Sequence, residues 1–240
     1  MTGIEWFIAA AVVLIGAILQ GSIGFGLGMV AAPLLILIDP RFVPGPLLAT
    51  AVVVTLFLAR RDWHAVQVRD LAWALSGRFW GVLAAVYVLT VVSPERIAIL
   101  FGVLILGAVG LSASGLHLAP TRGTLVLAGI LSGFMGTTVS IGGPPMALVY
   151  QRVSGARIRG TLSAYFVVGI LFSLLALRLA GRLGATELRM AGGLIPGALV
   201  GIGISSRTVT LLDRGYTRPA VLAVSAAAGL LVIAKYLLFG

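Results

Sequence analysis

The sequence contains no cysteine, and only 10% of its 240 residues carry a charge. Without thiols, the chain has no disulfide, no thiol nucleophile and no thiolate metal site. The two histidines, His64 and His117, fall at the ends of apolar segments, without the clustered carboxylates that a metal site needs. We therefore expect neither a metal nor a cofactor.

Charge is scarce because most of the chain is apolar. Hydrophobic residues make up 60% of the sequence, and they come in runs such as 71–92 and 97–118. Each run approaches the ~20 apolar residues that a helix needs to cross ~30 Å of hydrocarbon. The runs do not alternate apolar and polar residues as the strands of a membrane barrel would. The sequence predicts an all-α integral membrane protein whose surroundings are the lipid bilayer.

The formal net charge is +10, but the arginines are scattered singly through the connections rather than gathered in one patch. Such scattering is typical of residues that orient a membrane protein, so no nucleic-acid partner is expected. A basic loop surface also attracts anions toward the membrane.

Two of the predicted hydrophobic segments are unusually long. A continuous helix over 5–38 would measure ~50 Å at 1.5 Å per residue, which is too long for one crossing without steep tilt. This segment and 124–153 are interrupted by LQGSIGFGLGMVAAPLL and LSGFMGTTVSIGGPPMAL, so we expect both to be broken or re-entrant there. The eight predicted segments are 5–38, 44–59, 71–92, 96–118, 124–153, 160–179, 188–204 and 218–239.

The two interrupted stretches align with each other without a gap, which indicates an internal duplication. The first transmembrane repeat would cover 1–118 and the second 124–240, within a single membrane domain. The aligned pairs are Leu19–Leu131, Gly21–Gly133, Gly24–Gly136, Pro33–Pro145, Gly77–Gly193 and Gly81–Gly197.

The orientation of the repeats depends on the interruptions. If each long segment crosses once, the protein has eight spans and its basic loop residues divide evenly between the two faces. If each turns back as a hairpin, ten basic residues share one face and six the other, and the repeats are inverted. We favour the hairpins. The ten are Arg60, Arg61, Arg69, Arg122, Arg152, Arg157, Arg159, Arg207, Arg214 and Arg218.

The interruptions are the best candidates for a binding site, because backbone without helical hydrogen bonds survives in a membrane only where protein or a polar cavity covers it. A helix that restarts after a break presents free N–H groups and its positive dipole end to an anion. Pro144 suits the first turn of such a helix. The candidate substrate-binding residues are Gln20, Gly21, Ser22, Gly24, Gly26, Gly28, Arg78, Gly136, Thr137, Thr138, Ser140, Gly142, Gly143, Pro144 and Pro145.

Simpler explanations compete with this one. Glycines in membrane helices often only let two helices approach closely. Arg78, some seven residues into its segment, could either pair with an anionic substrate or extend its guanidinium to the membrane surface. Ser22 and Ser140 have no histidine or carboxylate in neighbouring span interiors, so an intramembrane enzyme is not expected.

The stretches GSIGFGLGMVAAPLL and GTTVSIGGPP, together with the length and the duplicated plan, resemble the sulfite exporter TauE/SafE family of the toluenesulfonate-uptake permease group. The resemblance covers essentially the whole chain. It implies a multi-pass permease of the bacterial inner membrane that moves small sulfur-containing anions such as sulfite, sulfoacetate or other organosulfonates. It also implies that Gly21 to Gly28 and Gly136 to Pro145 line the substrate path.

Together these features predict a secondary transporter that works by alternating access, with its small anionic substrate bound near the midplane between the repeats. No ATP-binding motif is present, so an ion or substrate gradient would supply the energy. A passive anion channel and a non-transporting subunit of a larger complex stay open as alternatives, and so does assembly into a homodimer.

Overall fold

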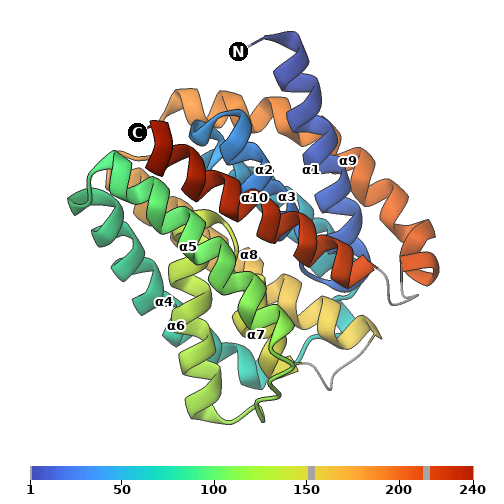
Figure 1. The fold of residues 1–240 in the computed structure, drawn as a ribbon. Helices are drawn as coiled ribbons and strands as arrows, with labels where there is room; N and C mark the ends of the chain where they lie inside the picture. Colours follow the sequence, from blue (N-terminus) through green and yellow to red (C-terminus); the bar gives the residue numbers. More distant parts are fainter. Residues whose placement is uncertain (1, 151–154, 213–216, 240) are drawn as a thin grey trace.

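The computed structural model describes residues 2–150, 155–212 and 217–239, and these residues form helices and no strand (Figure 1). Two short 3-10 turns, Pro40–Phe42 and Trp63–Ala65, flank the third helix. The helices are α1 (Gly3–Ile23), α2 (Leu27–Ile38), α3 (Gly45–Arg61), α4 (Val68–Val91), α5 (Pro94–Ala113), α6 (Arg122–Val139), α7 (Gly143–Tyr150), α8 (Gly155–Leu179), α9 (Ala185–Leu212) and α10 (Thr217–Phe239).

Six of the described helices are long and apolar enough to cross a membrane, namely α1, α4, α5, α6, α8 and α9. Large apolar side chains are exposed on the outside of the bundle, such as Phe7, Trp80 and Leu179. An exterior of this kind suits lipid and not water. The prediction of an all-α, multi-pass membrane protein is confirmed.

The predicted segments correspond to ten helices in the described ranges because the first and the fifth segment each contain two. The fourth ends at Ala113, earlier than predicted, and an irregular stretch leads to α6. Residues 151–153 of the fifth segment, and with them Arg152, lie outside the described residues, as does Arg214.

The first interruption is a sharp turn between α1 and α2. Gly24 and Gly26 have φ angles of 96° and 133°, a left-handed region that favours glycine. The turn folds α2 back along α1, so that Phe42, just after α2, meets Trp6 near the start of α1 with their rings 5.3 Å apart. The first segment is therefore a helical hairpin.

The second interruption has the same shape with different residues. α6 ends at Val139, and the next residue, Ser140, takes a left-handed φ of 60°. α7 begins at Gly143 with two prolines in its first turn. The chain again turns back, because the N–H of Leu118, before α6, donates to the carbonyl of Leu148, near the end of α7, at 3.2 Å.

Helices from the first half of the chain pack against helices from the second half. α4 lies along α6 and α1 lies along α9, while α3 contacts α8 and α5 lies beside α10 (Figure 1). Glycines permit the closest approaches: a Cβ on Gly77 or Gly81 would collide with carbonyl oxygens of α6, and one on Gly197 would lie 2.5 Å from the carbonyl oxygen of Ala10. At these positions the glycines serve helix packing.

We expect the substitution Gly81→Ala to destabilise the protein by about 1–3 kcal/mol, because the added methyl group meets the Ile130 carbonyl between α4 and α6. Gly107→Ala is the matched control. Nothing lies within 4 Å of a Cβ at Gly107 in α5, so this change should be neutral or slightly stabilising. Thermal unfolding of the detergent-solubilised variants measures the difference, and equal stabilities would contradict this packing.

Candidate functional site

The two interruptions meet at the centre of the bundle. A Cβ on Gly28, at the start of α2, would collide with the carbonyl oxygen of Ser140 in the second break. A Cβ on Gly143, at the start of α7, would lie 3.0 Å from the ring of Phe25 in the first. The two turns are thus in direct contact, with α2 and α7 both starting from the point where they touch.

A small cavity of about 40 Å³ lies where the breaks touch. It has room for a few water molecules or a small ion. Its lining is half polar, unlike the exterior of the bundle. The lining residues are Gln20, Phe25, Gly26, Gly28, Met29, Leu48, Ala51, Arg78, Gly136, Ser140, Ile141, Gly142, Gly143, Phe166 and Ile170.

Arg78 reaches this cavity from α4, and its side chain is buried, with 1% of the residue exposed. The alternative that Arg78 extends to the membrane surface is therefore wrong. Its Nη1 donates to Ser132 Oγ at 3.2 Å, and Ser132 Oγ donates to the carbonyl of Gly142 at 2.6 Å. The guanidinium thus contacts the second break through Ser132.

The space around the guanidinium is made by glycine and by aromatic rings. A Cβ on Gly169 of α8 would collide with Arg78 Nε, so only glycine fits there. The guanidinium carbon lies 5.0 Å from the ring centre of Tyr165 and 5.7 Å from that of Phe166, within the range of cation–π attraction. The rings stabilise the cation without neutralising it.

No carboxylate pairs with Arg78 within the described part of the chain. The ion pairs found there join Arg41 to Asp39, and Arg61 and Arg159 to Asp62. Arg78 Nε is buried without a hydrogen-bond partner. A buried charge of this kind is costly unless a counter-charge is supplied. The cavity therefore favours an anion.

The structure brings together about half of the predicted site residues. They line the cavity from both breaks and from α4. Gln20 also holds the first turn, because its Oε1 accepts a hydrogen bond from the Leu27 N–H at 3.2 Å. The predicted residues on the cavity are Gln20, Gly26, Gly28, Arg78, Gly136, Ser140, Gly142 and Gly143.

The other predicted residues have different neighbours. Ser22 donates to the carbonyl of Ile18, and Thr138 donates to that of Phe134, each within its own helix. Thr137 shares a hydrogen bond of 2.8 Å with Ser173.

The remaining four predicted residues pack elsewhere. Gly21 packs against Ser205, and Gly24 packs against Arg159. Pro145 is buried within α7, and Pro144 lines a second cavity.

Sequence reasoning missed the apolar part of the wall. Phe166 and Ile170 come from α8, and Leu48 and Ala51 come from α3. Nothing in the pattern of these apolar runs separates a residue that faces the cavity from one that faces lipid. Phe25 is different, because it stands between Gly24 and Gly26 in the stretch 21–28 that the family resemblance implies for the substrate path.

A second, larger cavity of about 200 Å³ adjoins the first, and Phe25, Gly26 and Met29 line both. Its exposed surface is almost entirely apolar. The other lining residues are Leu19, Ser112, Pro144, Ala147, Leu148, Ile158, Val221 and Leu222.

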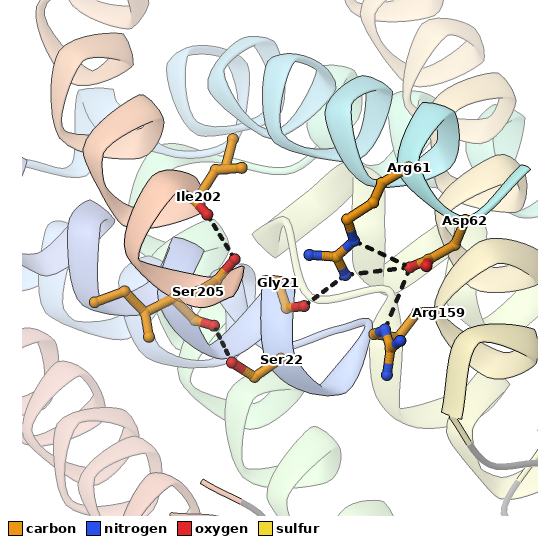
Figure 2. Close-up of polar contacts among 8 residues, drawn as sticks. Gly21, Ser22, Arg61, Asp62, Arg159, Ile202 and Ser205 are labelled. Carbon is orange, nitrogen blue, oxygen red and sulfur yellow. Dashed lines mark hydrogen bonds and ion pairs between the residues drawn. The ribbon is translucent and has the colours of Figure 1, made fainter. Parts of the chain in front are cut away.

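A cluster of charged side chains from both halves of the chain lies at the end of α1 (Figure 2). Asp62, 5% exposed, accepts from Arg61 Nη2 at 3.1 Å and from Arg159 Nε at 3.2 Å. Arg61 Nη2 also donates to the carbonyl of Gly21 at 2.9 Å. The sequence analysis counted Arg61 and Arg159 only as basic loop residues and did not single out Asp62.

The pair between Asp39 and Arg41 is a useful contrast, since the Arg41 side chain is 65% exposed. The hydrogen bond from Arg41 holds the pKa of the Asp39 carboxyl below its usual value. Among the residues that the structure describes, no group of three or more histidine, cysteine, aspartate or glutamate side chains could hold a metal ion.

Replacing Asp62 by asparagine should destabilise the protein by about 2–3 kcal/mol, because it leaves Arg159 and Arg61 without their counter-charge in a largely buried place. Arg41→Gln, which removes an exposed ion pair, should leave the midpoint of thermal unfolding almost unchanged. If the two variants melt alike, the cluster does not anchor α1.

The family model described as "Sulfite exporter TauE/SafE" matches residues 8–232 of the chain. No curated protein and no solved structure matches the chain. The match covers both interruptions, the buried arginine and nearly every described helix. The chain belongs to the sulfite exporter TauE/SafE family.

Proposed function

We propose that this protein is a secondary transporter of small sulfur-containing anions such as sulfite, and that it binds them in the cavity around Arg78. The observation that carries this proposal is a fully buried guanidinium without a carboxylate partner in the described structure. Membership of a sulfite exporter family supports a transported anion as the missing counter-charge.

The geometry around Arg78 suits an oxyanion. A Cβ on Gly136 would lie 3.3 Å from Nη2, and one on Gly142 would lie 3.4 Å from Nη1, so the guanidinium points at the junction of α6 and α7. The N-terminus of α7 begins there, and that of α2 faces the same cavity. The positive dipole ends of both helices would therefore face a bound anion.

In this proposal the chain consists of two inverted repeats, with the site near the membrane midplane between them. The helical hairpins support this, because an odd number of helices in each half reverses the second half. Gly28 and Ser140, which touch, hold equivalent positions on the register that aligns Gly21 with Gly133. Contact between equivalent residues is expected at a two-fold axis.

Alternating access would operate through the two ends of the bundle. A hollow of about 610 Å³ reaches Pro44, whose carbonyl accepts from Ser140 Oγ on the cavity wall at 3.2 Å. The C-terminal end of α1, at Gly21, is held by the Asp62 cluster. We infer an arrangement closed at the cluster and more open beside Pro44, in a protein of the bacterial inner membrane.

Arg78→Met should lower sulfite flux into liposomes about 10- to 100-fold, which corresponds to the loss of one or two charge-assisted hydrogen bonds. The same variant should melt at a higher temperature than the unmodified protein without substrate, because a buried unpaired charge has been removed. Arg189→Met, at an exposed position in α9, should change neither property. Normal, saturating flux in Arg78→Met would overturn the proposed site, and non-saturating flux in the unmodified protein would indicate a channel.

Single cysteines test the inverted topology, since the chain has none of its own. In the inverted arrangement, a membrane-impermeant thiol reagent labels His64→Cys and Arg122→Cys from one side, and Arg41→Cys and Arg189→Cys from the other. All four positions are exposed. If each long segment crossed once, Arg189→Cys would label together with His64→Cys and Arg122→Cys, so this variant decides between the two topologies.

A further inference from the structure

An apolar groove runs along the outside of the bundle, away from the cavity around Arg78. α3 and α4 both pack on α8, and all three helices line the groove. Its volume is about 860 Å³. Since a cavity of about 150 Å³ holds a six-carbon ring, the groove has room for on the order of thirty carbon atoms. The two acyl chains of a phospholipid contain about that many.

The groove is fixed at one end, where the connection between α3 and α4 is held against the start of α8. The N–H of Gln67 in this connection donates to Thr161 Oγ1 at 3.1 Å. A Cβ on Gly160 would lie 2.5 Å from the carbonyl oxygen of Asp62, so the two backbones are in close contact there. These contacts lie within the protein itself, and the groove is therefore formed before any ligand enters it.

The lining is charged and aromatic at this end and apolar at the other. Arg60 and Trp63 line the groove beside the connection, and both are exposed. Leu56, Leu75 and Val168 line it one or two helical turns further along their helices. Tryptophan and arginine are typical of the membrane surface, where lipid headgroups lie. The groove thus runs from the membrane surface into the hydrocarbon.

A second arginine lies at the same end of the groove. Arg157 stands seven residues before Ala164 and eleven before Val168, so helical periodicity places all three on one face of α8. The ion pairs among the described residues include neither Arg60 nor Arg157. The carboxylate of Asp62 is already engaged in its own cluster. The charge at this end of the groove is therefore positive.

We propose that this groove binds a phospholipid with a net negative charge, with its headgroup near Arg60 and Arg157 and its acyl chains along α4 and α8. Arg60 is the one charged residue among the described residues that line the groove, so the lining itself favours an anion. Each basic residue near the membrane surface adds affinity for an anionic lipid. The groove has walls from both halves of the chain, so the bound lipid should stabilise their packing. This inference goes beyond the proposed transport and does not depend on it.

The headgroup preference tests the charge match. Native mass spectrometry of the detergent-solubilised protein, titrated with phosphatidylglycerol or with phosphatidylcholine of the same acyl chains, measures the dissociation constant of the first bound lipid. Phosphatidylglycerol should bind about 25-fold more tightly, and Arg60→Gln and Arg157→Gln should each lower this preference about fivefold. Arg60→Lys should keep it. Arg96→Gln is the control, because it is exposed in α5, which contributes no described residue to the groove.

The apolar part of the groove is tested separately. Val168→Trp, at a partly exposed position, narrows the groove and should weaken binding of phosphatidylglycerol about tenfold, from the loss of one or two buried methylenes. Ala84→Trp, on an exposed part of α4 outside the groove, should bind the lipid like the unmodified protein. Glycerol 3-phosphate, which has the phosphate without acyl chains, should not displace the lipid.

Several results would overturn the proposal and leave the proposed anion transport untouched. One is equal binding of the two lipids, and another is a preference that Arg60→Gln and Arg157→Gln leave unchanged. If glycerol 3-phosphate displaces the lipid, the arginines bind a free phosphate and the groove holds no acyl chains. If Val168→Trp converts a dimer into a monomer without changing lipid binding, a second copy of the chain occupies the groove instead.

Discussion

The buried guanidinium of Arg78 is the constraint on which the centre of this protein depends. Moving a cation out of water costs several kcal/mol even after relaxation, so the surrounding chain has to make this position tolerable. It does so with one neutral hydroxyl at Ser132, two aromatic rings and glycines that leave space for the side chain. None of these groups neutralises the charge, so the positive potential of the guanidinium extends into the cavity that Arg78 lines.

The close packing of α4 on α6 determines where that charge lies. Gly77 and Gly81 on one helix, and Gly129 on the other, bring the two backbones together at the level of Arg78. A bulkier residue at any of these positions would push the helices apart and move the guanidinium away from the second break. Helix packing and the proposed anion binding are therefore compatible explanations of the glycines, because the packing positions Arg78.

The interruptions are stable inside the bundle because their polar groups form hydrogen bonds within the protein. Gln20 accepts from the first N–H of α2, Ser132 donates to the carbonyl of Gly142, and Ser140 donates to that of Pro44. The two halves differ in charge, however. On the register that aligns Gly77 with Gly193, the position of Arg78 corresponds to Leu194, which is fully buried. In the proposed duplicated scaffold, the candidate site thus has its cation in one half only.

The sequence by itself determined the membrane class and the position of both interruptions, because hydrophobic length and glycine are local signals. It singled out Arg78 as an isolated charge but left open whether that side chain is buried or reaches the membrane surface. Tertiary structure alone decided which residues meet. It placed Thr137 and Thr138 away from the cavity, and it brought in Phe166 and Ile170 from α8. Periodicity does not reveal this, because in lipid both faces of a helix are apolar, and only packing against other helices distinguishes the face that lines a site.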